Sequence, residues 1–207
     1  MTSKKVIKTI LTKDGYLLVK EHFKESELNM IKRELTVSPS NVFSMGKKSK
    51  KDDDMTFEIF RENEEYLSIP KFYGIKKIGE AEKNDEFLGD KIKIEFKGGL
   101  RPNQENLVNE TLEHLLKYDG GGICVGCGAG KTVMAIYIAH ILKVKTLVIV
   151  HKSFLLNQWR ERFEQFSDAR IGIIQQNKVE TEDKDVVIGM LQSIAKDKYD
   201  FGIFREF

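Results

Sequence analysis

Cysteine, histidine and long apolar runs are scarce in this sequence. Its two cysteines and four histidines argue against a structural zinc site and favour a reducing, intracellular environment. No apolar run approaches the roughly 20 residues of a membrane-spanning helix, and Lys13 and Asp14 interrupt any signal-peptide core. The net charge is only +2, so overall charge favours neither attraction to nucleic acid nor repulsion from it. We expect a cytoplasmic or nuclear protein with no membrane partner.

The rest of the composition is typical of a globular protein. With 41% hydrophobic and 32% charged residues, a chain of 207 residues is long enough for one large or two small domains. The character of the sequence changes after Gly98 and Gly99. We therefore expect a small mixed α+β accessory region at residues 1–96 and an α/β domain at residues 97–207.

Short segments with alternating apolar and polar residues predict most elements of the first region. The predicted elements are a hairpin at 8–12 and 16–19, a helix at 26–35 capped by Ser26, a turn at 70–74, and strands at 55–61, 65–69 and 91–96. The charged segment at residues 47–54 is expected to be a solvated loop, with a nucleic-acid patch as the alternative.

In the second region, strand patterns alternate with helical ones. The predicted elements are helices at 101–117, 133–142 and 153–166, the last capped by Ser153, and strands at 123–125, 145–150, 170–174 and 186–188. The strand at 145–150 is nearly all apolar, as expected for a strand buried on both faces of a parallel sheet. This order predicts a doubly wound α/β domain, in which nucleotides bind at the carboxyl ends of the strands.

A glycine-rich loop lies between the predicted strand at 123–125 and the following helix. The loop residues are Gly126, Cys127, Gly128, Ala129, Gly130, Lys131 and Thr132. Glycines let successive backbone N–H groups face one anion, and the start of a helix adds partial positive charge. In a phosphate-binding loop of this kind, Lys131 reaches the β- and γ-phosphates and the Thr132 hydroxyl binds Mg²⁺. Val125 stands where the usual pattern has a glycine, but three glycines remain for the cradle.

Two alternatives exist for this loop. One is a glycine-rich turn that leads into an ordinary helix. The other is a redox role for Cys124 and Cys127, whose spacing is Cys-x-x-Cys. That role would have to replace nucleotide binding as the explanation of the loop. The placement of Gly-Lys-Thr at a strand-to-helix junction favours phosphate binding over both.

The loop and several neighbouring segments resemble the first motor lobe of a superfamily 2 helicase. The resemblance is to the DEAD/DEAH-type helicases of large nucleocytoplasmic DNA viruses and to related repair and transcription helicases. Residues 100–104 resemble the family's adenine-reading segment, which implies that Gln104 pairs with the adenine edge and that Arg101 stacks on the base or binds a phosphate. The resemblance implies a P-loop RecA-like parallel sheet, an incomplete first lobe, and ATP with Mg²⁺ as ligands. Weaker likenesses to the viral accessory region occur at residues 34–37, 69–74 and 96–101.

Two further segments resemble the motifs that contact nucleic acid in this family. They are residues 148–159 and 187–193, and they imply contacts with a DNA or RNA backbone from Ser153, Gln192 and Ser193. Hydroxyl and backbone N–H groups bind phosphates without reading sequence. His151 is either another phosphate contact or a residue that simply ends a strand.

ATP hydrolysis in this family also needs an acidic motif, and we find none downstream of the loop. No Asp-Glu pair follows Thr132, while Asp85-Glu86 lies upstream in the wrong topological order. Without an Asp for Mg²⁺, a Glu for water and the arginine of a second lobe, this chain alone is expected to bind nucleotide and not to turn it over. A separate polypeptide that carries the remaining motor is therefore a possible partner. The alternatives are a non-catalytic binding module and a small P-loop kinase or GTPase; the GTPase lacks its Asn-Lys-x-Asp motif.

Overall fold

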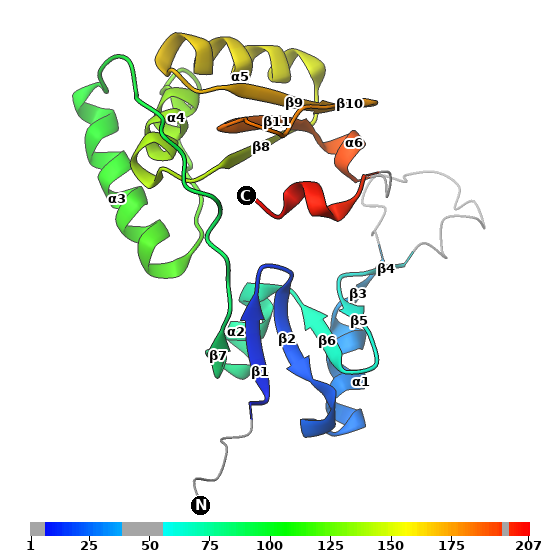
Figure 1. Ribbon diagram of the computed structural model, residues 1–207. Helices are drawn as coiled ribbons and strands as arrows, with labels where there is room; N and C mark the ends of the chain where they lie inside the picture. Colours follow the sequence, from blue (N-terminus) through cyan, green and yellow to red (C-terminus); the bar gives the residue numbers. More distant parts are fainter. Residues whose placement is uncertain (1–6, 39–55, 196–198) are drawn as a thin grey trace, which may run out of the picture. The chain divides into compact units, whose positions relative to one another are not determined.

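The computed structural model describes residues 7–38, 56–195 and 199–207. The chain divides into two compact units, Met1–Phe87 and Leu88–Phe207, and each is described here by itself (Figure 1). The predicted charged loop at 47–54 lies outside the described residues. The domain boundary after residue 96 stays a prediction; residues 88–96 belong to the second unit, where Ile94 is fully buried beside Ile136.

The first unit is a small sheet with two α-helices. Its strands run in the order β5-β6-β2-β1-β7, and a separate two-stranded piece pairs β3 with β4. The strands are β1 (Thr9–Thr12), β2 (Gly15–Val19), β3 (Thr36–Val37), β4 (Phe57–Glu58), β5 (Arg61–Glu62), β6 (Tyr66–Ile69) and β7 (Lys83–Asn84). The helices are η1 (Lys20–His22), α1 (Glu25–Glu34) and α2 (Lys71–Ile78). The predicted hairpin is confirmed, with Thr9 opposite Leu18.

Three predictions for the first unit are wrong. The predicted turn at 70–74 is instead the start of α2, with Pro70 as its N-cap. Gly74 packs directly on Tyr16, since a Cβ at Gly74 would lie 2.4 Å from the Tyr16 Cγ. The strand at 55–61 is replaced by the two short strands β4 and β5. Helix α1 is capped at Lys24, not at Ser26, and the Glu27 side chain accepts the Lys24 backbone N–H at 2.9 Å.

The second unit has a mainly parallel sheet with helices packed on it, which confirms the predicted fold class. The strand order is β10-β9-β11-β8; β11 is parallel to both β8 and β9, and β10 is antiparallel to β9. The strands are β8 (Thr146–Val150), β9 (Ile171–Gln175), β10 (Lys178–Val179) and β11 (Val186–Met190). The helices are α3 (Pro102–Tyr118), α4 (Lys131–Leu142), α5 (Ser153–Phe166), α6 (Leu191–Ile194) and η2 (Phe201–Phe204).

Apolar contacts hold these layers together. On α5, Leu156 packs with Ile173 and Ile188 of the sheet, so this helix covers one face (Figure 1). On α4, Met134 packs against Val108 of α3, and both side chains are fully buried. Ile136 of α4 also packs with Phe163 of α5, so the helix that follows the glycine loop is fixed by packing against both α3 and α5.

Two predicted strands of the second unit do not form, and a third differs from expectation. Residues 123–125 are irregular, and residues 91–96 make only isolated bridges, from Lys91 to Val144 and from Phe96 to Ser167. Strand β8 forms as predicted but lies at the edge of the described sheet, with Ile149 52% exposed, so it is not buried on both faces. A strand needs a neighbour for its ladder of hydrogen bonds, and the segment at 123–125 has no such neighbour among the described strands.

Candidate nucleotide and nucleic-acid site

The glycine loop enters α4 through two residues in the left-handed region. Gly128 has φ +77° and Gly130, the N-cap of α4, has φ +86°. Residues that carry a side chain rarely adopt this backbone conformation, so the path of the loop requires glycine at both positions. No atom lies within 4 Å of a Cβ built on Gly126 or Gly128, so the space beside the loop is open on that side. An open, glycine-turned loop at a helix start is a cradle of the kind that anions occupy.

Lys131 is the first residue of α4, and its side chain folds back over the loop. Its Nζ donates to the carbonyl oxygens of Val125 at 3.0 Å and Gly126 at 2.9 Å, and the side chain remains exposed. Val125 contributes its backbone carbonyl to this contact, not its side chain. A valine where the usual pattern has a glycine is therefore compatible with the contact. The ammonium group is thus held inside the curve of the loop, and Thr132 is half-buried next to it.

Gln104 ties the start of α3 to the same loop. Its Oε1 accepts the backbone N–H of Arg101 at 2.9 Å, and its Nε2 donates to the carbonyl of Ala129 at 2.7 Å. The residue is only 4% exposed, while Arg101 is exposed. The amide lies so close to the loop that a Cβ on Gly130 would be 2.3 Å from Nε2. Sequence reasoning missed this contact with the loop, because nothing local relates positions 104 and 129.

The contact leaves part of the Gln104 amide for other partners. A side-chain amide has two donor hydrogens and two acceptor lone pairs, and the protein uses one of each. Contact between Gln104 and adenine therefore stays a prediction, and the remaining hydrogen and lone pair are the groups that would make it.

A second group of predicted residues lies where β8 and β11 end. His151, Lys152 and Ser153 are exposed between β8 and α5. Across the sheet, the Gln192 Nε2 donates to the carbonyl of His151 at 2.7 Å. Because β8 and β11 are parallel neighbours, this bond joins the two segments predicted to contact nucleic acid.

The two serines of this group differ in their surroundings. Ser153 is exposed at the first turn of α5, where its hydroxyl is accessible. It was predicted as the helix cap, but the N-cap is Lys152 and no side chain fills that role. Ser193 is only 8% exposed, and its hydroxyl accepts the backbone N–H of Gln176 at 2.9 Å. Its contact with nucleic acid stays a prediction, whereas its contact with the loop after β9 is structural.

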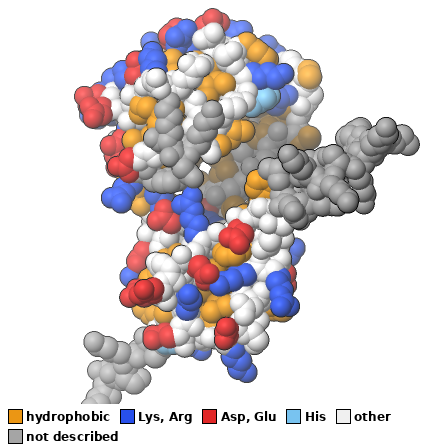
Figure 2. All heavy atoms as spheres, turned by 90° about the vertical axis from the view of Figure 1, so that its right-hand side faces the viewer, with side chains coloured by type: hydrophobic (Ala, Val, Ile, Leu, Met, Phe, Trp, Pro, Cys, Tyr) orange, Lys and Arg blue, Asp and Glu red, His pale blue; other side chains and the backbone are white. Residues whose placement is uncertain are grey.

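The chain as a whole carries nearly balanced charge. On the face drawn in Figure 2, basic, acidic and apolar side chains are interspersed, which agrees with the net charge of +2. Among the described residues, no three His, Cys, Asp or Glu side chains are grouped so as to hold a metal ion. Within the same residues, no helix combines the length and apolar character that crossing a bilayer requires.

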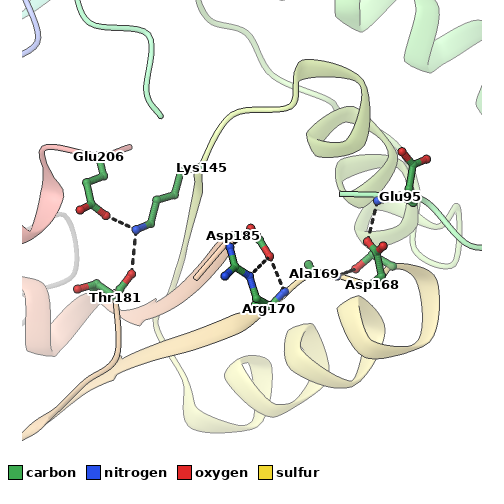
Figure 3. Close-up of polar contacts among 9 residues, drawn as sticks. Glu95, Lys145, Asp168, Ala169, Arg170, Thr181, Asp185 and Glu206 are labelled. Carbon is green, nitrogen blue, oxygen red and sulfur yellow. Dashed lines mark hydrogen bonds and ion pairs between the residues drawn. The ribbon is translucent and has the colours of Figure 1, made fainter. Parts of the chain in front are cut away.

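Two ion pairs of the second unit, Arg170–Asp185 and Lys145–Glu206, join segments that are distant in the sequence (Figure 3). Asp185, only 3% exposed, accepts the backbone N–H, Nε and Nη2 of Arg170 at 2.8, 2.9 and 2.9 Å, and this pairing holds the pKa of its carboxyl below the usual range. The buried ammonium of Lys145 binds the Thr181 carbonyl at 2.8 Å and the Glu206 carboxylate. Asp185 thus aligns the starts of β9 and β11 and is not available to a nucleotide.

The upstream acidic pair is also engaged. In the first unit, both carboxylate oxygens of Glu86 accept from Lys71 Nζ at 2.7 Å, and Asp85 pairs with Lys83. That Asp85-Glu86 is not the acidic motif of the motor stays a prediction, which rests on its position upstream of the loop.

Comparison with known proteins identifies the family. The family described as type III restriction enzyme, res subunit (ResIII) matches residues 97–203, which include the glycine loop and the ends of β8 and β11. Over 204 residues the chain is 35% identical to L396 of Acanthamoeba polyphaga mimivirus, named as an ATP-dependent RNA helicase; the match covers 97% of this chain and 39% of that protein.

Two other relatives match shorter parts. The chain is 35% identical over 109 residues to the helicase 161L of Invertebrate iridescent virus 6 (52% of this chain, 22% of that protein). It is 42% identical over 65 residues to the DNA 3'-5' translocase XPB2 of Sulfurisphaera tokodaii (31% of this chain, 15% of that protein). The chain thus spans at most about two fifths of the length of these three relatives.

All three relatives are named as helicases or as a translocase. The resemblance predicted from the motifs is confirmed. This chain belongs to the ResIII family and is homologous to the superfamily 2 helicases of large DNA viruses.

Proposed function

We propose that this chain binds ATP with Mg²⁺ in the loop at residues 126–132. With the rest of a motor, it would couple ATP hydrolysis to movement on, or unwinding of, DNA, with RNA as the second choice. The observation that carries the proposal is the Lys131 ammonium, held by two loop carbonyls at the start of α4 and preceded by two left-handed glycines.

In this proposal each loop residue has a distinct role. A phosphate that enters the cradle replaces the carbonyls of Val125 and Gly126 as the partner of Lys131, which neutralises the β- and γ-phosphates. The Thr132 hydroxyl is an oxygen ligand of the type that Mg²⁺ prefers. Arg101 and the remaining donor hydrogen and acceptor lone pair of Gln104 select adenine.

The nucleic-acid backbone would lie at the ends of β8 and β11. Exposed polar groups there come from His151, Ser153 and Gln192. Ser193 would contribute indirectly, because its hydroxyl holds the loop after β9 through the N–H of Gln176. The net charge of only +2 favours local contacts of this kind over a broad basic field. DNA is preferred because the resemblance includes the DNA helicases of repair and transcription, and one relative is named as a DNA translocase.

Turnover would require residues that this sequence does not contain. No Asp-Glu pair follows Thr132 in the sequence. The groups that hold Mg²⁺ and orient water would therefore come from another polypeptide, or from a segment like those that the longer relatives have outside the matched region. The exposed edge of β8, with Ile149 half-exposed, could receive an added strand. The viral relatives suggest a host-cell or virion setting. The second candidate is a non-catalytic nucleotide- or nucleic-acid-binding module.

A pair of lysine variants tests the site. Lys131→Ala should abolish binding of a fluorescent ATP analogue in the presence of Mg²⁺, whereas Lys117→Ala removes an exposed lysine from the last turn of α3 and should leave binding intact. Circular dichroism should be unchanged in both variants. Retention of ATP affinity by Lys131→Ala would refute the site. Binding by the wild-type chain without phosphate release is expected for both candidate functions, so it does not separate them.

A further inference from the structure

Two thiols lie in and beside the proposed nucleotide loop, and neither takes part in the core. Cys124 and Cys127 are both free and both exposed. Buried cysteines act as small apolar side chains, whereas exposed thiols are the ones that oxidants and other thiols reach. Packing therefore does not explain these cysteines.

The two residues between the thiols are the ones that hold Lys131. The carbonyls that accept from Lys131 Nζ belong to Val125 and Gly126, the residues enclosed by the Cys-x-x-Cys spacing. A bond between the two sulfurs would close a small ring around these peptide units. Any change in their orientation then changes the position of the ammonium group.

The backbone at this point lies outside the sheet, although the Val125 side chain between the two cysteines packs against the core cluster of Val108 and Met134. Residues 121–126 are irregular and belong to no strand, so closure breaks no sheet ladder. A Cβ on Gly126 would have no atom within 4 Å, so this part of the loop has room to move. A disulfide needs its two Cα atoms about 4.4–6.8 Å apart, so the irregular segment at 124–127 would have to close into a turn as the bond forms.

We propose that Cys124 and Cys127 form a reversible disulfide that switches off nucleotide binding. The inference rests on the proposed binding of ATP by the loop. With a peroxide as oxidant, one thiolate attacks the peroxide oxygen, which gives a sulfenic acid and water (or an alcohol from an alkyl peroxide). The second thiol then attacks the sulfenic sulfur, which forms the S–S bond and releases water. Two thiols are oxidised by two electrons, the peroxide is reduced, and a dithiol reverses the step by exchange.

The disulfide would act on binding through the shape of the cradle. Ring closure fixes the peptide units of Val125 and Gly126 and turns the N–H groups near Cys127 away from a common focus. Binding of an anion by a nest depends on that common focus. The reduced loop binds the triphosphate, and the oxidised loop does not.

The test uses the full chain, a fluorescent ATP analogue and hydrogen peroxide. After oxidation and removal of peroxide, peptide mass spectrometry should find a Cys124–Cys127 disulfide, and the affinity should fall at least about tenfold and recover with dithiothreitol. Cys124→Ser cannot form the bond, so its affinity should be the same before and after the treatment.

Each other outcome overturns a defined part of the reasoning. A disulfide that leaves the affinity unchanged refutes the switch, and so does treated protein without the disulfide. Equal loss in Cys124→Ser and wild type would assign the effect to oxidation of Cys127 alone. Failure of the reduced wild type to bind ATP would instead overturn the proposed function, and the inference with it.

Discussion

Replacing Gln104 with alanine removes two hydrogen bonds, one within the first turn of α3 and one from α3 to the nucleotide loop. These are the bond from Arg101 N–H to Oε1 at 2.9 Å and the bond from Nε2 to the Ala129 carbonyl at 2.7 Å. The site is buried, so water does not simply replace the side chain. We expect the loop to become less ordered while the rest of the unit stays folded.

The size of the effect follows from the number of bonds to the loop. Each hydrogen bond contributes about 0.5–1.5 kcal/mol net, so loss of the one bond to the loop corresponds to about 2- to 12-fold in an equilibrium constant. Because the cradle binds phosphates, this loss should weaken ATP and GTP alike. One lost contact with adenine adds about 0.5–1.5 kcal/mol for ATP only, and this lowers the ratio of ATP to GTP affinity by about 2- to 12-fold.

Titration with fluorescent ATP and GTP analogues separates the two roles. Asn103→Ala is the matched control, since Asn103 is the exposed neighbour of Gln104 on the same helix. An unchanged affinity for GTP in Gln104→Ala would refute support of the loop. An unchanged ratio of ATP to GTP affinity would refute contact with adenine.

Two further predictions concern the loop glycines and the buried carboxylate. Gly130→Ala should weaken ATP binding more than Gly128→Ala: both require positive φ, which costs about 1–2 kcal/mol, but only a Cβ at 130 meets Gln104, at 2.3 Å from Nε2. The titration used for Gln104 measures this, and equal losses would contradict it. Asp185→Asn should lower the free energy of unfolding by about 1–3 kcal/mol at pH 7, measured with urea. Because Arg170 lowers the folded-state pKa of Asp185, the stabilisation is complete above the unfolded value of about 4 and is lost as pH falls through the lower folded value. The difference between variant and wild type should therefore shrink at pH 3, and a constant difference would refute the pairing.

Local patterns predicted the elements whose formation depends on neighbouring residues in the chain. The apolar run at 145–150 and the spacing at 153–166 predicted β8 and α5 to within one residue at each end. The glycine-lysine sequence predicted the loop at the start of α4, because the left-handed positions at 128 and 130 require glycine.

The failures concern features that depend on distant residues. A strand forms only beside a partner, and residues 91–96 alternate correctly yet contribute the buried Ile94 without pairing as a strand. At residues 70–74, proline and glycine suggest a turn, but the contact between Gly74 and Tyr16 belongs to a helix. The bond from Gln104 to Ala129 likewise depends on how α3 packs on α4, which no local pattern contains.

The position of β11 between β8 and β9 has a consequence for synthesis on the ribosome. Both of its neighbours precede it in the chain, and β8 ends at residue 150 while β11 ends at residue 190, about 40 residues later. At about 5–20 residues per second, β8 waits about 2–8 s for the strand that pairs with it. During that time an apolar strand with open backbone groups is accessible to other nascent chains. The sheet closes in one late step, when β11 leaves the exit tunnel and enters the space between two strands made before it.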